Sequence, residues 1–204
     1  MVAPLSLALA AASKSAPIPI GARHRDLYFT DGSVTLLAED TLFRVHKAWL
    51  QRCSTAFKTA LSIPSPDGGE GMSDENPVLL AVSALDLERF LYVLYPPTVG
   101  LYEPCSLNEW ISVCRVASMF DAQSIRQLAI REMGPLCHGP VQRIVLAQLL
   151  DISQWLMPAY AELTVRDSPV TLEEGKLLGV ETVERPGQVR GKLRSHADRD
   201  ERVR

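Results

Sequence analysis

The sequence predicts an α+β fold, in which a small, mainly antiparallel sheet is flanked by helical hairpins and followed by a helical extension. Three observations lead to this class. Short apolar runs separated by turn residues begin the ordered part of the chain, as in a sheet of short strands. Between Leu42 and Phe57 the apolar period changes from two residues to three and four, which indicates a strand that runs directly into a helix. Apolar stripes at helical spacing then follow one another.

The first three strands are predicted at Asp26–Phe29, Val34–Leu37 and Leu42–His46. Asp31-Gly32 separates the first two, and Asp-Gly between apolar runs is among the strongest short-range signals for a β-hairpin. Glu39-Asp40 turns the chain again. We therefore predict a three-stranded antiparallel meander.

Helices make up most of the remaining domain. Ser54 and Ser83 stand where a helix N-cap needs a hydroxyl, and Asp67–Asn76 is a polar, glycine-rich segment that predicts an exposed loop. A further strand is predicted at Pro77–Val82. The apolar stripes of the later helices are Leu87, Phe90, Leu91 and Leu94; Leu107, Trp110, Ile111 and Cys114; and Ile125, Leu128, Ala129 and Met133.

These patterns predict four segments. Residues 1–22 form a flexible tail, 23–134 the α+β domain, 140–184 a helical extension that follows the proline- and glycine-rich residues 134–140, and 185–204 a disordered charged tail. The apolar run Leu5–Ala12 has no basic segment before it, so we interpret it as part of the flexible tail. A targeting segment is the alternative.

Composition argues against several classes of partner. The net charge of −3 provides no basic field for nucleic acid or an anionic membrane. No run approaches the roughly 18 apolar residues of a membrane span. The four cysteines include no C-x-x-C pair, and two of them lie on apolar helical faces, which favours free thiols in the cytoplasm or nucleus. We expect no cofactor and no metal.

Candidate catalytic residues are few. His46 lies between a strand and a helix, with no nucleophile or carboxylate fixed beside it in sequence. Cys137-His138 has no partner ligands at zinc spacing, and Gly68–Gly71 lacks the Lys-Ser/Thr of a phosphate-binding loop. We therefore expect no enzyme. The alternative is a hydrolase or metal-dependent enzyme whose site is dispersed along the chain.

One stretch carries a family resemblance. Residues Phe43 to Phe57 read F-x-V-H-K-x-x-L-x-x-x-S-x-x-F, which resembles the signature of the BTB/POZ domain in the variant common in fungal proteins with a short helical C-terminal extension. The resemblance implies a protein-interaction module that forms homo- or heterodimers. For many members it also implies recruitment of a cullin-type ubiquitin ligase or of transcriptional partners. In that family the motif histidine, here His46, is structural.

The resemblance also implies partner-binding residues. Dimers of the family often bring an aspartate of the first strand near a basic residue after the motif histidine, and Asp26 and Lys47 match these positions. Solvated surface charges are the alternative for both. The implied interaction surface comprises the N-terminal strands and the first helix, where Tyr28 and Trp49 are candidates. Trp49 follows the apolar arc beside Leu50, so a place in the core is its alternative.

Overall fold

The computed structural model describes residues 21–62, 70–98, 101–102, 104 and 106–178. The chain divides into two compact units, Met1–Pro135 and Leu136–Arg204. The predicted N-terminal tail, up to residue 20, and the predicted disordered tail, 185–204, lie outside the described residues. Elements of the first unit are β1 (Ala22–Tyr28), β2 (Val34–Ala38), β3 (Thr41–Val45), α1 (Lys47–Cys53), α2 (Thr55–Ala60), β4 (Val78–Leu80), α3 (Ala84–Leu94), α4 (Leu107–Met119) and α5 (Gln123–Leu136).

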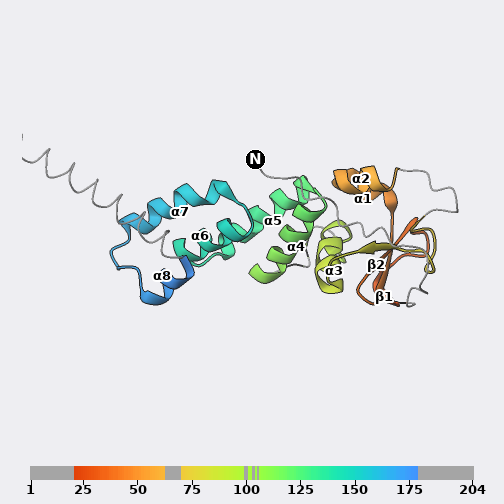
Figure 1. Ribbon diagram of the computed structural model, residues 1–204, viewed down its shortest axis with the longest axis horizontal. Helices are drawn as coiled ribbons and strands as arrows, with labels where there is room; N and C mark the ends of the chain where they lie inside the picture. The colour runs from red at the N-terminus through yellow and green to blue at the C-terminus, as the bar shows by residue number, and fades with distance from the viewer. Residues whose placement is uncertain (1–20, 63–69, 99–100, 103, 105, 179–204) are drawn as a thin grey trace, which may run out of the picture. The chain divides into compact units, whose positions relative to one another are not determined.

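The four strands form one mixed sheet in the order β1-β3-β2-β4. The α+β class is confirmed, with helices beside a small sheet (Figure 1). Only β2 and β3 pair antiparallel, whereas β1 pairs parallel with β3 and β4 parallel with β2. The predicted meander and the mainly antiparallel sheet are therefore wrong.

The burial of β2 explains why the strands do not form the predicted meander. Every residue of β2 is buried, and all except Thr35 are apolar, which suits a central strand with a neighbour on each edge. β3 and β4 fill those two edges, so β1 lies on the far side of β3. The Asp31-Gly32 turn does reverse the chain, and the Gly32 N–H donates to the Phe29 carbonyl at 3.1 Å. The turn sets the direction of β2 but not its hydrogen-bonding partner.

Hydroxyl caps start several of the helices. Ser54 Oγ accepts from the Phe57 N–H at 3.0 Å, and Ser83 Oγ accepts from the Asp86 N–H at 3.1 Å. Both predicted N-caps are thus confirmed. The helix α4 begins with a complete capping box between Ser106 and Glu109. Within the first unit, α3 packs against α4 and lies between α4 and the strands (Figure 1).

The core of the first unit contains most of the signature stretch. Phe43, Leu50 and Phe57 are almost fully buried. The Phe57 ring lies 4.6 Å, centroid to centroid, from the ring of Phe120. The Trp49 side chain is 47% exposed, so the alternative that placed it in the core is wrong.

The second unit has a core of its own. It comprises α6 (Gly139–Leu149), α7 (Ser153–Val165) and α8 (Leu172–Leu178). One cluster of buried residues comprises Val141, Ile144, Ala159, Leu163 and Leu178. Before α8, Thr171 Oγ1 accepts from the Glu174 N–H at 3.2 Å while Glu174 Oε2 accepts from the Thr171 N–H at 2.9 Å. Among the described residues, no helix combines the length and apolarity needed to cross a membrane.

Candidate partner-binding surface

Tyr28, at the end of β1, is tied to a segment far away in sequence. Its hydroxyl donates to Asp74 Oδ1 at 2.6 Å. Arg23 donates to the other oxygen of the same carboxylate from Nε at 2.9 Å and lies over the tyrosine ring, 4.7 Å from its centroid. Residues 70–76, predicted as an exposed loop, are thereby fastened to β1, which leaves Tyr28 half-buried.

The electrostatics of this cluster follow from the same contacts. Burial first, and the hydrogen bond to Asp74 second, raise the pKa of Tyr28. For Asp74, burial opposes ionisation, but hydrogen bonds from Tyr28 and Arg23 outweigh it and hold the pKa of the carboxyl below its usual value. The sequence alone did not single out Asp74 or Arg23, because each needs the other to be recognised across the fold.

Asp26 lies on the exposed side of the same strand. Its carboxylate is 3.6 Å from Arg25 Nε and 3.5 Å from the Tyr92 hydroxyl. These are long contacts of an exposed group, which are worth little in stability. Asp26 therefore keeps a carboxylate available at the surface of β1.

Lys47 begins α1, where Ser33 caps the helix from outside. His46 occupies the N-cap position but makes no side-chain cap bond. Instead, Ser33 Oγ accepts from the Lys47 N–H at 2.9 Å. The hydrogen bond to Ser33 thus fixes the backbone of Lys47 at the start of α1. Its side chain projects from a helix pair, α1 and α2, that contains no acidic residue.

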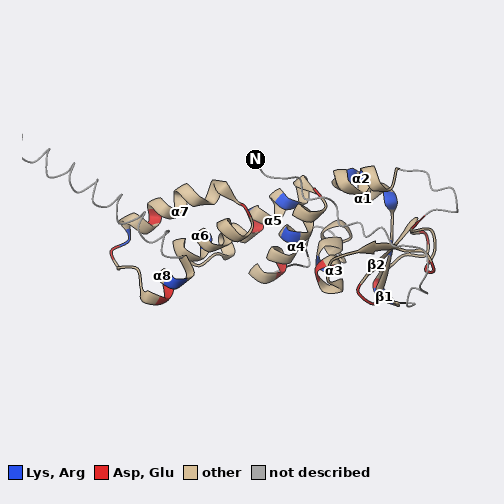
Figure 2. Cartoon of the chain, viewed as in Figure 1, with Lys and Arg blue, Asp and Glu red and all other residues tan. Residues whose placement is uncertain are grey.

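The charges of α1 and α2 have one sign. Their residues include Lys47, Arg52 and Lys58 and no aspartate or glutamate, and Figure 2 shows this basic pair beside the sheet. Arg52 lies over the indole of Trp49, 5.8 Å from the ring centroid. A basic helix pair that carries a half-exposed indole suits an acidic partner surface.

A groove opens beside Trp49. It has a volume of about 400 Å³. Its walls come from α1, α3 and α5, and its lining residues are Trp49, Arg52, Cys53, Val93, Leu94, Ser124, Ile125 and Leu128. Aliphatic and aromatic side chains surround a single charged group, as in pockets that receive an apolar anchor. The sequence predicted Trp49 as a residue of the interaction surface. It did not predict that residues of α3 and α5, which are distant in the chain, form a groove with it.

His46 is held in a small polar chain. Its Nε2 lies 3.3 Å from Asp31 Oδ2, and its Nδ1 lies 3.3 Å from the Tyr95 hydroxyl. The backbone N–H of His46 donates to the same hydroxyl at 3.1 Å. The hydrogen bond to His46 lowers the pKa of Asp31. Sequence inspection found no carboxylate near His46, since Asp31 approaches it only across the turn before β2. The contacts fix the junction of β3 and α1, in agreement with a structural role.

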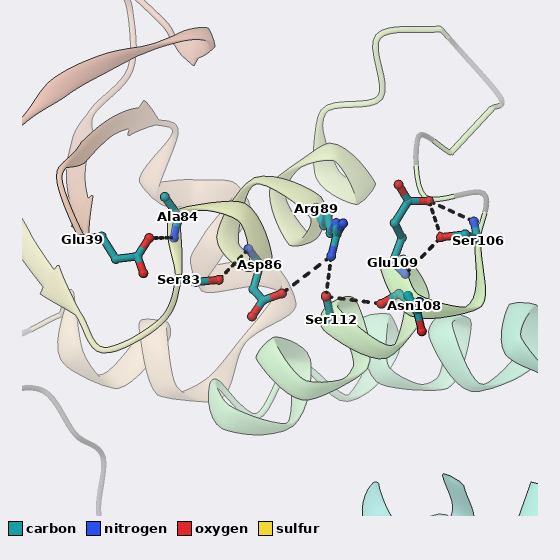
Figure 3. Close-up of polar contacts among 9 residues, drawn as sticks. All are labelled: Glu39, Ser83, Ala84, Asp86, Arg89, Ser106, Asn108, Glu109 and Ser112. Atoms are coloured by element: carbon teal, nitrogen blue, oxygen red, sulfur yellow. Dashed lines mark hydrogen bonds and ion pairs between the residues drawn. The ribbon is translucent and has the colours of Figure 1, made fainter. Parts of the chain in front are cut away.

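A second hollow, of about 220 Å³, lies along α3 and α4 and is lined by Leu85, Glu88, Arg89, Tyr92, Pro104 and Glu109. Figure 3 shows the polar contacts of two of its charged residues, Arg89 and Glu109. Arg89 donates to Ser112 Oγ at 2.8 Å, and Glu109 accepts from Ser106 in the capping box at 2.9 Å. These side chains stabilise helix ends and helix contacts, and they do not converge on a common point.

The three thiols that the structure describes, Cys53, Cys114 and Cys137, are unreactive in character. Burial raises the pKa of Cys53 to about 11, and burial also raises the pKa of Cys114 and Cys137. At neutral pH these groups remain protonated, which is the poorly nucleophilic form. In the part of the chain that the structure describes, no three histidine, cysteine or acidic side chains gather as metal ligands would.

Comparison with known proteins identifies the first unit. Residues 27–133 match the BTB/POZ domain family, and this range includes the sheet from Leu27 onward and all the helices up to α5 except its last residues. A search of curated proteins found no significant match. BTB/POZ domains mediate protein–protein interactions and dimerisation and are not typically catalytic. On its sequence match and its fold, the chain belongs to the BTB/POZ domain family.

Proposed function

We propose that this protein dimerises and recruits a protein partner through the surface formed by β1 and α1, with Asp26, Tyr28, Lys47 and Trp49 as contacts. The observation that supports this best is the groove of about 400 Å³ beside Trp49. A half-exposed indole at the edge of an apolar groove provides a large contact area with few rotatable bonds, as expected at the centre of an interface.

Charge defines the kind of partner. The helix pair that carries Lys47 and Arg52 contains no acidic side chain, so it favours an acidic protein surface. Asp26, on β1, contributes a charge of opposite sign. In a symmetric dimer the same patch meets itself, and Asp26 of one protomer then faces Lys47 of the other.

The wider role proposed here rests on the family. We infer an adaptor for a cullin-type ubiquitin ligase or a transcriptional regulator, in the cytoplasm or nucleus and with no nucleic acid or membrane partner of its own. The chain is assigned to the fungal type, with a BTB/POZ domain at 23–134 and a helical extension at 140–184. The separate core of the second unit supports that extension.

Sedimentation of the full chain over a wide concentration range tests dimerisation, and pulldown with a purified cullin scaffold tests recruitment. Lys47→Glu is expected to weaken self-association by about tenfold or more, because it places like charges opposite each other. Lys176→Glu, on α8, makes the same charge change in the second unit. This matched control is expected to leave self-association unchanged.

A chain that remains a monomer at every concentration and binds no cullin would contradict the proposal. A dimer that ignores the cullin would retain the interaction module and remove the ligase role. Equal effects of Lys47→Glu and Lys176→Glu would place the interface elsewhere.

A further inference from the structure

The irregular part of β1 depends on one imidazole. β1 advances from Arg23 to Tyr28 while β3 advances only from Leu42 to Arg44, so the intervening residues leave the ladder as a bulge. Their backbone N–H groups then need other acceptors. The N–H groups of Asp26 and Leu27 both donate to His24 Nδ1, at 3.2 and 3.1 Å.

These bonds define the protonation state of His24. A ring nitrogen that accepts hydrogen bonds carries no proton, so the proton of the neutral ring is on Nε2. Nε2 lies 3.3 Å from Glu88 Oε1 on α3 and donates to it. The ring stacks on Phe43 with centroids 4.9 Å apart, and its side chain is only 13% exposed. The imidazole is held in one orientation and one tautomer.

We propose that His24 is a pH-sensitive latch of the β1 bulge. A proton added to Nδ1 converts the acceptor into a donor that faces two other donors. Both hydrogen bonds are then lost, and the backbone of Asp26 and Leu27 is released. Histidine is the side chain whose charge ordinarily changes between about pH 5 and 8, so acidification over that range tests the latch.

The charged and titratable groups around the ring act in opposite directions. From α3, the Glu88 carboxylate favours the imidazolium, and the Tyr92 ring meets the imidazole edge-on at 6.4 Å. From β1 itself, Asp26 and Arg25 lie close by as an exposed pair. From β3, the uncharged Phe43 stacks on the ring. The two backbone N–H groups oppose the imidazolium, and because they are fixed in the strand they cannot turn away while the bulge is closed.

Opening the latch alters the strand that carries Asp26 and Tyr28. Acidification is therefore expected to weaken partner binding through β1. This consequence rests on the proposed function, whereas the latch itself rests only on the contacts of His24.

Nuclear magnetic resonance of the full chain between pH 7.5 and 5 tests the latch. In the wild type, hydrogen-exchange protection of the Asp26 and Leu27 amides is expected to fall by up to about tenfold per pH unit, the limit for one linked proton. His24→Asn is the matched control. An asparagine oxygen can accept from the N–H groups two and three residues ahead, as in an Asx turn, but does not titrate. Protection in His24→Asn is expected to stay constant.

Two results would overturn the latch: the same pH dependence in the wild type and His24→Asn, or a proton on His24 Nδ1 at neutral pH in the nitrogen spectrum. Glu88→Gln provides a second readout, since loss of the carboxylate is expected to move the opening midpoint to lower pH. An unchanged midpoint would also count against the latch. If the amides open but self-association keeps its pH dependence in His24→Asn, the latch stands and its link to the proposed surface fails.

Discussion

The signature stretch divides its aromatic residues between core and surface. Phe57 is 2% exposed and packs on Phe120, whereas Trp49, on the preceding helix, is 47% exposed. Both are large apolar side chains at helical spacing, so the sequence pattern alone did not distinguish them. Phe120, at the end of α4, packs on Phe57, whereas α1, α3 and α5 leave a groove beside Trp49. Phe57 therefore contributes to the stability of the core, whereas Trp49 provides exposed contact area.

Phe57→Ala is therefore expected to lower the free energy of unfolding by about 3–5 kcal/mol, as for other buried aromatic residues. Thermal unfolding followed by circular dichroism measures the loss. Trp49→Ala is the control within the same helix pair, and its effect on stability is expected to be much smaller. Equal losses in the two variants would be inconsistent with the burial described above.

Ser54 carries two hydrogen bonds in a buried position. Its hydroxyl accepts from the Phe57 N–H and donates to the Phe120 carbonyl. Ser54→Ala removes the N-cap of α2 and leaves a buried carbonyl without this donor, so we expect a loss of about 2–3 kcal/mol in denaturant unfolding. Ser62→Ala removes an exposed hydroxyl at the other end of α2 and is expected to cost under about 0.5 kcal/mol. A loss that small in Ser54→Ala would refute the role of the cap.

At the scale of elements, features set by neighbouring residues were predicted correctly, whereas the pairing of the strands was not. The strand-to-helix change at His46 and the N-caps at Ser54 and Ser83 depend on neighbouring residues, and each was predicted correctly. The partner of β1 depends on which strand fills the edge of β2, which is decided by burial across the whole sheet. The run Val34–Ala38, apolar at every position except Thr35, was the available signal for a central strand. Asp74 likewise lies far from its partners in sequence. Leu94, Ile125 and Leu128 were placed on apolar stripes, but the stripes did not show that these residues line a groove with Trp49.

The helix α8 is held by an ion pair whose pH dependence can be predicted. Arg166 donates to both carboxylate oxygens of Glu174 at 2.8 Å. This hydrogen bonding, followed by the Thr171 N–H, lowers the pKa of Glu174 to about 2. Because the folded pKa lies below the unfolded value of about 4.3, the stabilisation is present above that value. It is lost as the pH falls from about 4 towards 2.

Hydrogen exchange of α8 at pH 4.5 and pH 2.5 measures this loss. Protection in the wild type is expected to fall between the two pH values. In Glu174→Gln it is expected to be low at both, because no carboxylate remains to ionise. Glu173→Gln, at the exposed neighbouring position, is expected to behave as the wild type. Identical pH profiles for the wild type and Glu174→Gln would show that the pair does not stabilise α8.

At the scale of the whole molecule, two cores share one chain. The first includes Phe43, Leu50, Phe57 and Phe90, and the second includes Ile144, Ala159 and Leu163. The division after Pro135 falls at the end of α5. A unit with a closed core has the main requirement for folding alone.

A fragment from Gly21 to His138 is therefore expected to fold, because it retains the four strands, the helices α1 to α5 and all the contacts of Phe57 and His24 described above. Its thermal transition, followed by far-ultraviolet circular dichroism, should be cooperative, as should that of the first unit in a full-length Leu163→Ala variant, in which the second core is weakened. If the fragment instead binds a dye specific for exposed apolar surface and melts without cooperativity, the first unit requires residues beyond 138. The family match at 27–133 would then describe a domain that needs its helical extension in order to fold.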